Sequence, residues 1–375
     1  MASERPTKIA YLVHNLNDAA VHRRVALLEA GGADVTVAGF HRDAAIPRRI
    51  GSAPATPLGR TADGALAQRI LRILVRAVAP RQLSALVAGA DVVLARNLET
   101  LVLARWLLRP GQRLVYECLD IHRLLLRTGP VSWLLHRLEA WALRRVGLVV
   151  VSAPAFRDIY FRERIGYTAP VMLVENLVPA LDDDPAQVSV PAPPPPYAVG
   201  WFGMLRCRRS FELLKALAAG SGGRVKVVIA GRPSTDLFAD FEAEAAAAPG
   251  VTFLGGYSAQ DLSKLFGRIH FIWAIDYFEE GLNSAWLLPN RLYEGIAHGA
   301  VPIALRGVAT ATWLAEQGAG VLLDDPSSEL QPLLEQLTPQ EYTELRAAVE
   351  QVPRSAVTMN REQAKAITDA IRGPA

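Results

Sequence analysis

Residues 191–203 have the sequence Pro-Ala-Pro-Pro-Pro-Pro-Tyr-Ala-Val-Gly-Trp-Phe-Gly, and this stretch decides how the chain is organised. Proline lacks the backbone N–H and the φ freedom that a strand or a helix interior requires, so the first half of the stretch is a break. An acidic run at 182–184, followed by Pro185, precedes it. The apolar residues 197–202 then predict a buried strand that ends at Gly203. We therefore interpret residues 177–196 as a linker between two domains.

On both sides of this linker, apolar and β-branched runs alternate with stretches of helical spacing. The runs that predict strands are 8–13, 34–39, 91–95, 113–118, 148–152 and 171–175 before the linker, and 197–202, 225–230, 251–254, 270–274, 301–305 and 320–323 after it. The main stretches of helical spacing in the first half are 20–30, 98–108, 132–145 and 155–164. Because the runs are apolar on both faces, each half predicts a parallel sheet that helices cover on both sides.

We therefore predict an α/β protein of two Rossmann-like domains that face a central cleft, where open parallel sheets bind their ligands. A length of 375 residues suits two domains of about 150–200 residues each. The boundaries that we predict are an N-terminal domain at 1–176, the linker at 177–196, a C-terminal domain at 197–352 and a final segment at 353–375. The helical stretch in that final segment has no strand after it and can cross back to the N-terminal domain.

The composition excludes several classes of protein. Hydrophobic residues make up 51% and charged residues 21%, which is enough apolar material for two cores and excludes a disordered chain. A net charge of +3 is too small to imply a nucleic-acid partner. Cys118 and Cys207 form no CxxC motif, and the histidines form no HExxH motif, so we expect neither disulfides nor a bound metal. Without an apolar leader or a run of about 18 apolar residues, we expect a cytoplasmic protein, soluble or peripheral to a membrane.

Asp120 is the candidate catalytic residue of the first domain. It follows the predicted strand 113–118, at the end of the sheet where ligands bind. A carboxylate in an apolar run is costly to desolvate unless it has a task or a partner. Its chemistry suits a general base that takes the proton from an acceptor hydroxyl. The alternatives are a helix N-cap and an ion pair with Arg123 or Arg127.

The stretch 289–294, Pro-Asn-Arg-Leu-Tyr-Glu, predicts the start of a helix with Asn290 as its cap. A helix N-terminus at a cleft suits a diphosphate, through its backbone N–H groups and its dipole. Arg291 would add a charge-assisted contact to phosphate, Glu294 would accept hydrogen bonds from ribose hydroxyls, and we place Tyr293 in the same site. The alternative is a self-contained Arg–Glu pair on the helix surface.

A third candidate site lies where the strand at 197–202 meets the following helix. Gly203 allows close approach of the backbone to a ligand, and three arginines follow it before the helix. Of these, Arg206 and Arg209 are candidates to clamp the phosphates or the carboxylate of a donor. An exposed basic loop is the alternative for any single arginine.

Four weaker candidates line the predicted cleft. Asn15 and Asn17 follow the first strand, His122 stands beside Asp120, and Glu280 lies in the loop after the strand at 270–274. We expect these residues to contact an acceptor, although Glu280 can equally be a solvated loop charge. The first strand lacks the GxGxxG motif that follows it in dinucleotide-binding domains, which argues against an NAD-dependent dehydrogenase.

On these motifs the sequence resembles GT-B glycosyltransferases, the family 4 type most closely, over essentially the whole chain. Those enzymes carry a glycine-rich strand end and a basic residue, which match Gly203 and Arg209. They also carry two glutamates eight positions apart. Glu294 with residues 299–302 matches the second glutamate and its sequel, whereas Trp286 stands at the position of the first. The resemblance implies a nucleotide sugar as the donor.

The pattern at 115–120 is also similar to the glucuronosyltransferases of xanthan-type polysaccharide assembly. Those enzymes invert configuration, use an aspartate at this place as the base, and carry a basic residue where Arg291 stands. This resemblance implies a direct displacement with Asp120 as the base, in which arginines hold the leaving diphosphate without a metal or another cofactor.

Arginine-rich apolar stretches at 69–76, 122–127 and 133–145 suggest contact with a membrane surface. Basic amphipathic helices with Trp and Leu bind anionic lipid. The alternative is ordinary amphipathicity, with arginine side chains that extend over the core. We expect a peripheral protein on the inner face of the cell membrane.

These observations favour a hexosyl- or glucuronosyltransferase. It would use a nucleotide sugar, UDP-linked by expectation, to extend a lipid-linked or polysaccharide acceptor in exopolysaccharide or other bacterial surface-glycan synthesis. Two alternatives share the fold. One is a nucleotide-sugar 2-epimerase, which needs no membrane surface and has several acid/base side chains in its cleft. The other is a non-catalytic protein that binds nucleotide sugars.

Overall fold

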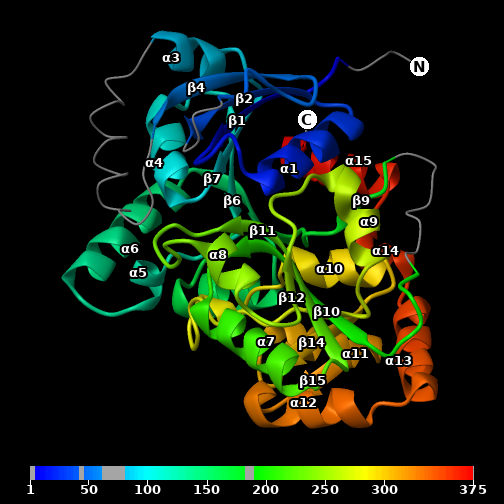
Figure 1. The fold of residues 1–375 in the computed structure, drawn as a ribbon. Helices are drawn as coiled ribbons and strands as arrows, with labels where there is room; N and C mark the ends of the chain where they lie inside the picture. Colours follow the sequence, from blue (N-terminus) through cyan, green and yellow to red (C-terminus); the bar gives the residue numbers. More distant parts are fainter. Residues whose placement is uncertain (1–4, 42–45, 61–80, 182–189, 375) are drawn as a thin grey trace. The chain divides into compact units, whose positions relative to one another are not determined.

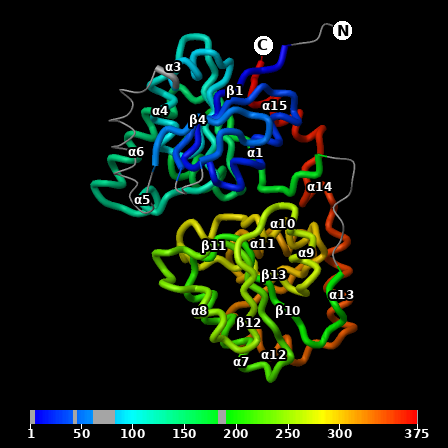
Figure 2. Tube along the Cα trace, turned by 45° about the horizontal axis from the view of Figure 1, so that its top comes forward, coloured from blue at the N-terminus to red at the C-terminus, as the bar shows by residue number. Residues whose placement is uncertain are grey.

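A computed structural model of the chain describes residues 5–41, 46–60, 81–181 and 190–374. The chain divides into two compact units, each with its own sheet (Figure 1). Unit 1 comprises Met1–Glu175 together with Met359–Ala375, and unit 2 comprises Asn176–Thr358. In Figure 2 the red C-terminal helix lies beside the blue N-terminal residues, in agreement with this division.

Among the described residues, the sheet of unit 1 has eight strands in the order β3-β4-β2-β1-β5-β6-β7-β8. All neighbouring strands run parallel except β3 and β4. Strand β1 lies between β2 and β5, so Ile9 pairs with Val35 on one side and with Val92 on the other. The strands are β1 Lys8–Val13, β2 Asp34–His41, β3 Arg49–Ile50, β4 Ala53–Arg60, β5 Val92–Arg96, β6 Arg113–Cys118, β7 Val146–Val151 and β8 Val171–Leu173.

Helices of unit 1 come from both ends of the chain. They are α1 Ala19–Ala30, α3 Arg81–Ala88, α4 Leu98–Leu107, α5 Arg123–Leu126, α6 Pro130–Leu143, the π-helix η1 Phe156–Arg164 and α15 Arg361–Arg372. The C-terminal helix α15 packs against α1 (Figure 1), and the Arg113 guanidinium donates a hydrogen bond to the carbonyl of Ala370. Unit 1 is therefore completed by the last residues of the chain.

Unit 2 contains a six-stranded, fully parallel sheet in the order β12-β11-β10-β13-β14-β15. Its strands are β10 Tyr197–Leu205, β11 Val225–Pro233, β12 Val251–Phe253, β13 Phe271–Trp273, β14 Val301–Leu305 and β15 Val321–Leu323. Its helices are α7 Arg208–Gly220, α8 Phe241–Ala246, η2 Ala259–Asp261, α9 Leu262–Phe266, η3 Asn283–Ala285, α10 Asn290–Ala297, α11 Ala309–Gln317, α12 Pro326–Gln336, α13 Pro339–Gln351 and α14 Arg354–Val357. A separate pair of short strands is formed by β9 Val178–Pro179 and β16 Thr358–Met359.

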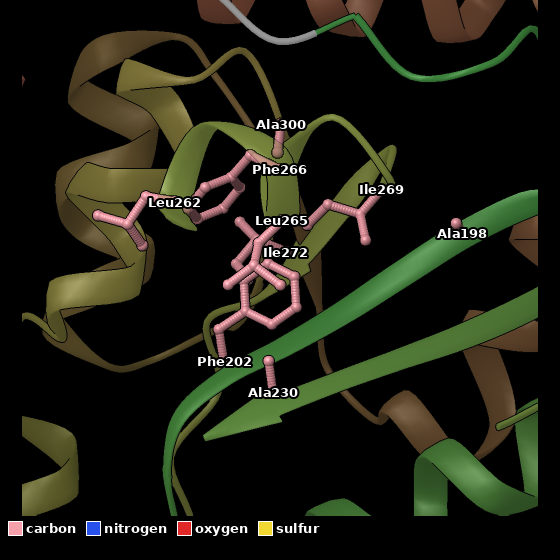
Figure 3. Close-up of a cluster of buried hydrophobic side chains, with 9 residues drawn as sticks. All are labelled: Ala198, Phe202, Ala230, Leu262, Leu265, Phe266, Ile269, Ile272 and Ala300. Carbon is pink, nitrogen blue, oxygen red and sulfur yellow. The ribbon is translucent and has the colours of Figure 1, made fainter. Parts of the chain in front are cut away.

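An apolar cluster fixes the central strands of unit 2 against α9 (Figure 3). Phe202 of β10 is 1% exposed, and its ring meets that of Phe266 edge-on at 5.2 Å between centroids. Burying one such side chain contributes about 2 kcal/mol. The cluster consists of Ala198, Phe202, Ala230, Leu262, Leu265, Phe266, Ile269, Ile272 and Ala300. It anchors the end of β10, directly before Gly203.

The predicted α/β fold with parallel sheets is confirmed, and the structure adds two features. Strand β4 was not predicted because its sequence contains Pro54 and Pro57, and prolines are confined to edge strands and irregular positions of a sheet. The stretch 155–164 was expected to be an ordinary helix and forms a π-helix instead. Among the described residues, no helix is long and apolar enough to cross a membrane.

Candidate functional site

The carboxyl edge of the unit 2 sheet gathers the predicted donor residues. Strands β10 and β13 are neighbours, and so are β13 and β14, the strand that follows α10. The loops that leave neighbouring parallel strands meet at this edge. Arg206 and Arg209 follow β10, and Arg291 stands in the first turn of α10.

Gly203 leaves open space at this edge. Its φ of +114° is a conformation that glycine adopts easily, and a Cβ atom placed on it would have no atom within 4 Å. Gly203 pairs with Gly231 of β11, so two residues without side chains lie next to each other, two residues before β10 ends at Leu205 and β11 at Pro233. A ligand can approach the backbone closely here.

Asp276 links two of the arginines. It follows β13 and the short run Ala274-Ile275, and its Oδ2 lies 3.7 Å from Nη2 of Arg206. Ser284 donates a hydrogen bond to its Oδ1 at 2.9 Å. Burial alone would raise the pKa of Asp276, but Arg206 and Arg291 outweigh burial and hold the pKa below its usual value. The carboxylate is therefore charged and keeps both guanidinium groups near the strand ends.

Arg291 has hydrogen-bonding capacity that the protein leaves unused. Its Nη2 donates to the carbonyl of Ile275 at 2.8 Å, while its Nε is buried and meets no hydrogen-bond partner in the described part of the chain. Burial lowers the pKa of this side chain, and Asp276 opposes that shift. A buried N–H without a partner is costly, which makes a ligand oxygen a favourable neighbour.

The start of α10 differs from the prediction in one respect. Asn290 is the first helical residue and not the cap; the cap is Pro289, which makes no side-chain bond to the helix.

Tyr293 is fully buried and its ring packs edge-on against Trp313, so its assignment to the nucleotide-sugar site is corrected to the core. Glu294 is 2% exposed, which excludes the alternative of an Arg–Glu pair on the surface.

Arg209 and Glu280, predicted for different parts of the site, are paired with each other. Nη1 of Arg209 donates to both carboxylate oxygens of Glu280, at 2.8 and 2.7 Å. The Arg209 guanidinium also lies over the ring of Tyr277, 4.1 Å from its centroid. Glu280 therefore lies at the carboxyl edge of the unit 2 sheet, which we call the donor edge. Arg208, the third arginine of the junction, pairs with Glu244 of α8 and stands apart from this group.

Asp120 lies two residues beyond β6 and is exposed, which corrects the argument that its carboxylate is desolvated. The N-cap alternative is also wrong, because His122 caps α5: its Nδ1 accepts a hydrogen bond from the backbone N–H of Leu124 at 3.2 Å. An exposed carboxylate at the carboxyl end of a strand remains accessible to a substrate.

Asn15 and Asn17 form the turn after β1. The side chain of Asn15 accepts a hydrogen bond from the backbone N–H of Asn17 at 3.2 Å, and Asp18 then caps α1. This geometry gives Asn15 a local role in the turn. Its predicted contact with the acceptor, like those of Asn17 and His122, stays a prediction.

A buried charged network beneath this edge of unit 1 was not predicted. Glu117 of β6 is 1% exposed and accepts hydrogen bonds from Tyr11 and Arg24, while a nitrogen of Arg96 lies 3.6 Å from it. Burial opposes the charge on Glu117, but Arg24 and Arg96 outweigh it and lower its pKa. Arg96 also lies 3.5 Å from Asp18. A glutamate inside the apolar run 113–118 was the sequence signal for this network.

Helix α6 has one charged residue in the core and an exposed apolar end. Glu139 is 1% exposed; Tyr160 donates to one of its oxygens at 2.7 Å, and the other meets no partner among the described residues. Burial raises the pKa of Glu139 to about 7, although the bond from Tyr160 opposes this shift. On the outside of the helix, Trp133 and Leu134 are 63% and 61% exposed.

This outer face of α6 overlaps the stretch 133–145 that was expected to contact a membrane, and it begins two residues earlier, at Val131. Val131, Trp133 and Leu134 are exposed there, and the Arg137 guanidinium lies over the Trp133 ring, 5.5 Å from its centroid. The predicted stretch 69–76 lies outside the described residues. We call Val131, Trp133, Leu134 and Arg137 the α6 patch.

Comparisons with known proteins agree with this architecture. No protein-family model matches the chain. The succinoglycan biosynthesis protein ExoL of Rhizobium meliloti (strain 1021) is 43% identical over 357 residues, which cover 92% of this chain and 88% of ExoL. Sucrose-phosphate synthase from Thermosynechococcus elongatus has a similar fold, with a TM-score of 0.69 at 14% identity over 98% of this chain and 96% of that one. HepE of Anabaena, solved with UDP and glucose, has a TM-score of 0.67 at 14% identity, over 96% and 98%.

Proposed function

We propose the following function from the family to which this chain belongs. It is a member of the family of the succinoglycan biosynthesis protein ExoL, within the GT-B glycosyltransferases. The chain is a glycosyltransferase of bacterial surface-polysaccharide synthesis. It moves a sugar from a UDP-linked donor to a lipid-linked or polysaccharide acceptor. The identity with ExoL supports the role in polysaccharide synthesis, and the likeness to HepE, which was solved with UDP, supports the donor.

The donor edge of unit 2 carries this proposal. Arg206 and Arg209 follow β10 and Arg291 stands at the start of α10, all at the edge where a Cβ atom on Gly203 would meet only open space. The charge of a nucleoside diphosphate suits guanidinium groups, which bind phosphate with two parallel hydrogen bonds. The same groups would stabilise the diphosphate as it leaves, so we propose that transfer needs no metal or other cofactor.

Calorimetric titration with UDP tests the donor site. Arg206→Gln removes a charge beside Asp276 and should weaken UDP binding about 10-fold, because hydrogen bonds to charged groups contribute about 1.5–3 kcal/mol. Arg208→Gln is the matched control, since Arg208 stands in the same junction but pairs with Glu244. Equal affinities for both variants would place the diphosphate elsewhere.

Asp120 is the residue that we propose as the general base. Its exposed carboxylate stands beyond the end of β6, where it can accept the proton of an acceptor hydroxyl during an inverting displacement. Asp120→Asn should reduce transfer at least about 100-fold and leave UDP affinity unchanged. Near-normal turnover in this variant would show that another residue is the base.

We also propose that the α6 patch binds the inner face of the cell membrane, where a lipid-linked acceptor is reached. Exposed arginines flank α6 in the sequence, Arg123 and Arg127 before it and Arg144 and Arg145 after it. Apolar insertion combined with attraction to anionic headgroups is the usual mode of peripheral binding.

Co-sedimentation with vesicles tests the membrane surface. The protein should sediment with phosphatidylglycerol vesicles more than with phosphatidylcholine vesicles, and added salt should weaken the binding. The double substitution Trp133→Ser and Leu134→Ser should abolish it, whereas Leu237→Ser, at an exposed position of unit 2, should not. Equal sedimentation of both variants would contradict the proposal.

A further inference from the structure

In this structure a carboxylate is paired with the guanidinium of Arg209. Nη1 of Arg209 donates to both oxygens of Glu280, at 2.8 and 2.7 Å. The two residues belong to segments that follow neighbouring strands, because Arg209 stands at the start of α7 after β10 and Glu280 lies in the loop after β13. The ion pair therefore spans the donor edge.

The two partners of this ion pair are held differently. The Arg209 guanidinium rests on the ring of Tyr277, which is 7% exposed and therefore fixed by its surroundings. The two side chains are about equally exposed, 52% for Arg209 and 54% for Glu280, so the difference lies in their backbones: Arg209 belongs to helix α7, whereas Glu280 lies in a turn. Exposed ion pairs are weak, since water and salt screen them and the side chains lose freedom on pairing. Glu280 is thus the partner that can leave while Arg209 stays in place.

The preceding residue provides a comparison within the same helix turn. Arg208 bonds Glu244 through two nitrogens, donates to the carbonyl of Leu237 at 2.9 Å and lies 3.6 Å from Glu212. Its guanidinium is thereby committed to holding α7 against α8. Arg209, by contrast, has a single carboxylate partner among the residues that the structure describes, Glu280. Its ring contact, Tyr277, lies in the loop that follows β13 at the carboxyl edge of the sheet.

We propose that Glu280 is an affinity-determining residue, a built-in counter-ion that the diphosphate of the nucleotide sugar displaces from Arg209. The inference rests on the proposed donor site. A guanidinium binds carboxylate and phosphate with the same geometry, so the two anions compete for one position. A diphosphate carries more charge than a single carboxylate and displaces it. Because the donor must displace Glu280, this residue lowers the affinity for the donor. When no donor is bound, its carboxylate neutralises the charge of Arg209.

A double-mutant cycle tests this competition, with UDP as the titrant and calorimetry as the readout. Glu280→Gln keeps the shape of the side chain and removes its charge, so UDP should bind about 2- to 5-fold tighter. Glu244→Gln removes the carboxylate partner of Arg208 and should leave UDP affinity unchanged. In an Arg209→Gln background, Glu280→Gln should give no gain, because the position under competition is gone.

Each outcome decides a different point. If the wild-type protein does not bind UDP, the proposed donor site fails and the inference falls with it. If the wild type binds UDP and Glu280→Gln is no tighter than Glu244→Gln, the donor site stands and the competition is overturned. If Glu280→Gln gains equally with and without Arg209, the effect is a general charge effect, and the displacement from Arg209 is again overturned.

Discussion

Gly231 approaches Gly203 so closely that a Cβ atom on Gly231 would lie 1.8 Å from the carbonyl oxygen of Gly203. The two residues are register partners on β11 and β10, at the edge where the donor residues gather. Gly231 has a φ of +143° and Gly203 a φ of +114°, so both adopt conformations that favour glycine. Their roles differ, because Gly231 is confined by a neighbouring backbone and Gly203 faces open space.

This difference predicts that alanine at Gly231 mainly lowers stability, whereas alanine at Gly203 mainly weakens UDP binding. Gly231→Ala forces backbone to move and should lower the free energy of unfolding of unit 2 by about 3 kcal/mol. Gly203→Ala introduces only backbone strain, about 1 kcal/mol, but places a methyl group where the donor approaches, so it should weaken UDP binding more than it destabilises. Urea unfolding and UDP titration measure the two effects. Equal loss of stability in both variants would contradict the geometry.

Glu139 predicts a pH dependence of stability. Its pKa rises from the ordinary 4.5 to about 7 in the folded protein, so the folded state holds the proton more tightly than the unfolded state does. The resulting stabilisation is full below pH 4.5 and is lost as the pH rises through about 7. Between pH 5 and pH 8 the free energy of unfolding should fall by about 2–3 kcal/mol relative to Glu139→Gln, which mimics the protonated form.

Urea unfolding of both proteins at several pH values measures this difference. The stability curves of the wild type and of Glu139→Gln should diverge above pH 5. Curves that stay parallel up to pH 8 would show that burial does not perturb Glu139 in this way.

The network around Glu117 predicts a large stability effect within unit 1. Glu117→Gln leaves Arg24 and Arg96 buried without their shared counter-charge, which should cost about 3–5 kcal/mol. Asp158→Asn is the control, because its ion pairs with Arg157 and Arg162 are exposed and should contribute less than about 1 kcal/mol. Thermal unfolding compares the two variants. A similar, small shift in both would refute the buried network.

The contacts of Arg291 lead us to predict that a positive charge alone is not sufficient for UDP binding at this position. Arg291→Lys keeps a cation but loses the buried Nε and the planar group that bonds Ile275, so UDP affinity should fall about 10- to 100-fold. The affinity for uridine, which has no phosphate, should change much less. Parallel titrations with the two ligands separate a phosphate contact from a general disturbance of α10, which would weaken both.

Burial explains how much of the fold was predictable from the sequence. Strand β6 was predicted residue by residue, because Arg113–Cys118 is an apolar run with polar flanks and is buried almost throughout. Strand β4 was missed because Pro54 and Pro57 interrupt its pattern, and its pairing with β2 and β3 makes it a strand. The local sequence gives the conformational preference of each residue, but it does not show which neighbouring strand will pair with the segment and override that preference.

The same reasoning applies to the site. The positions of Gly203 and Arg291 at the carboxyl edge follow from strand–helix alternation, so the sequence predicts where they lie. The pairing of Arg209 with Glu280 joins residues 71 positions apart, and Arg24 is 93 positions from Glu117. Such contacts depend on which strands become neighbours, which the sequence pattern does not specify. Glu139 carried no signal, because a glutamate on an amphipathic helix ordinarily faces solvent.

Sugar transfer itself tests the central claim most directly. Purified protein would be incubated with radiolabelled nucleotide sugars, with and without an extract of lipid-linked acceptor. We predict that label from a UDP-linked sugar enters the lipid-linked fraction only when the acceptor extract is present, and that Asp120→Asn abolishes this transfer. Label that never enters that fraction, or an epimerised nucleotide sugar formed without acceptor, would contradict the assignment as a glycosyltransferase.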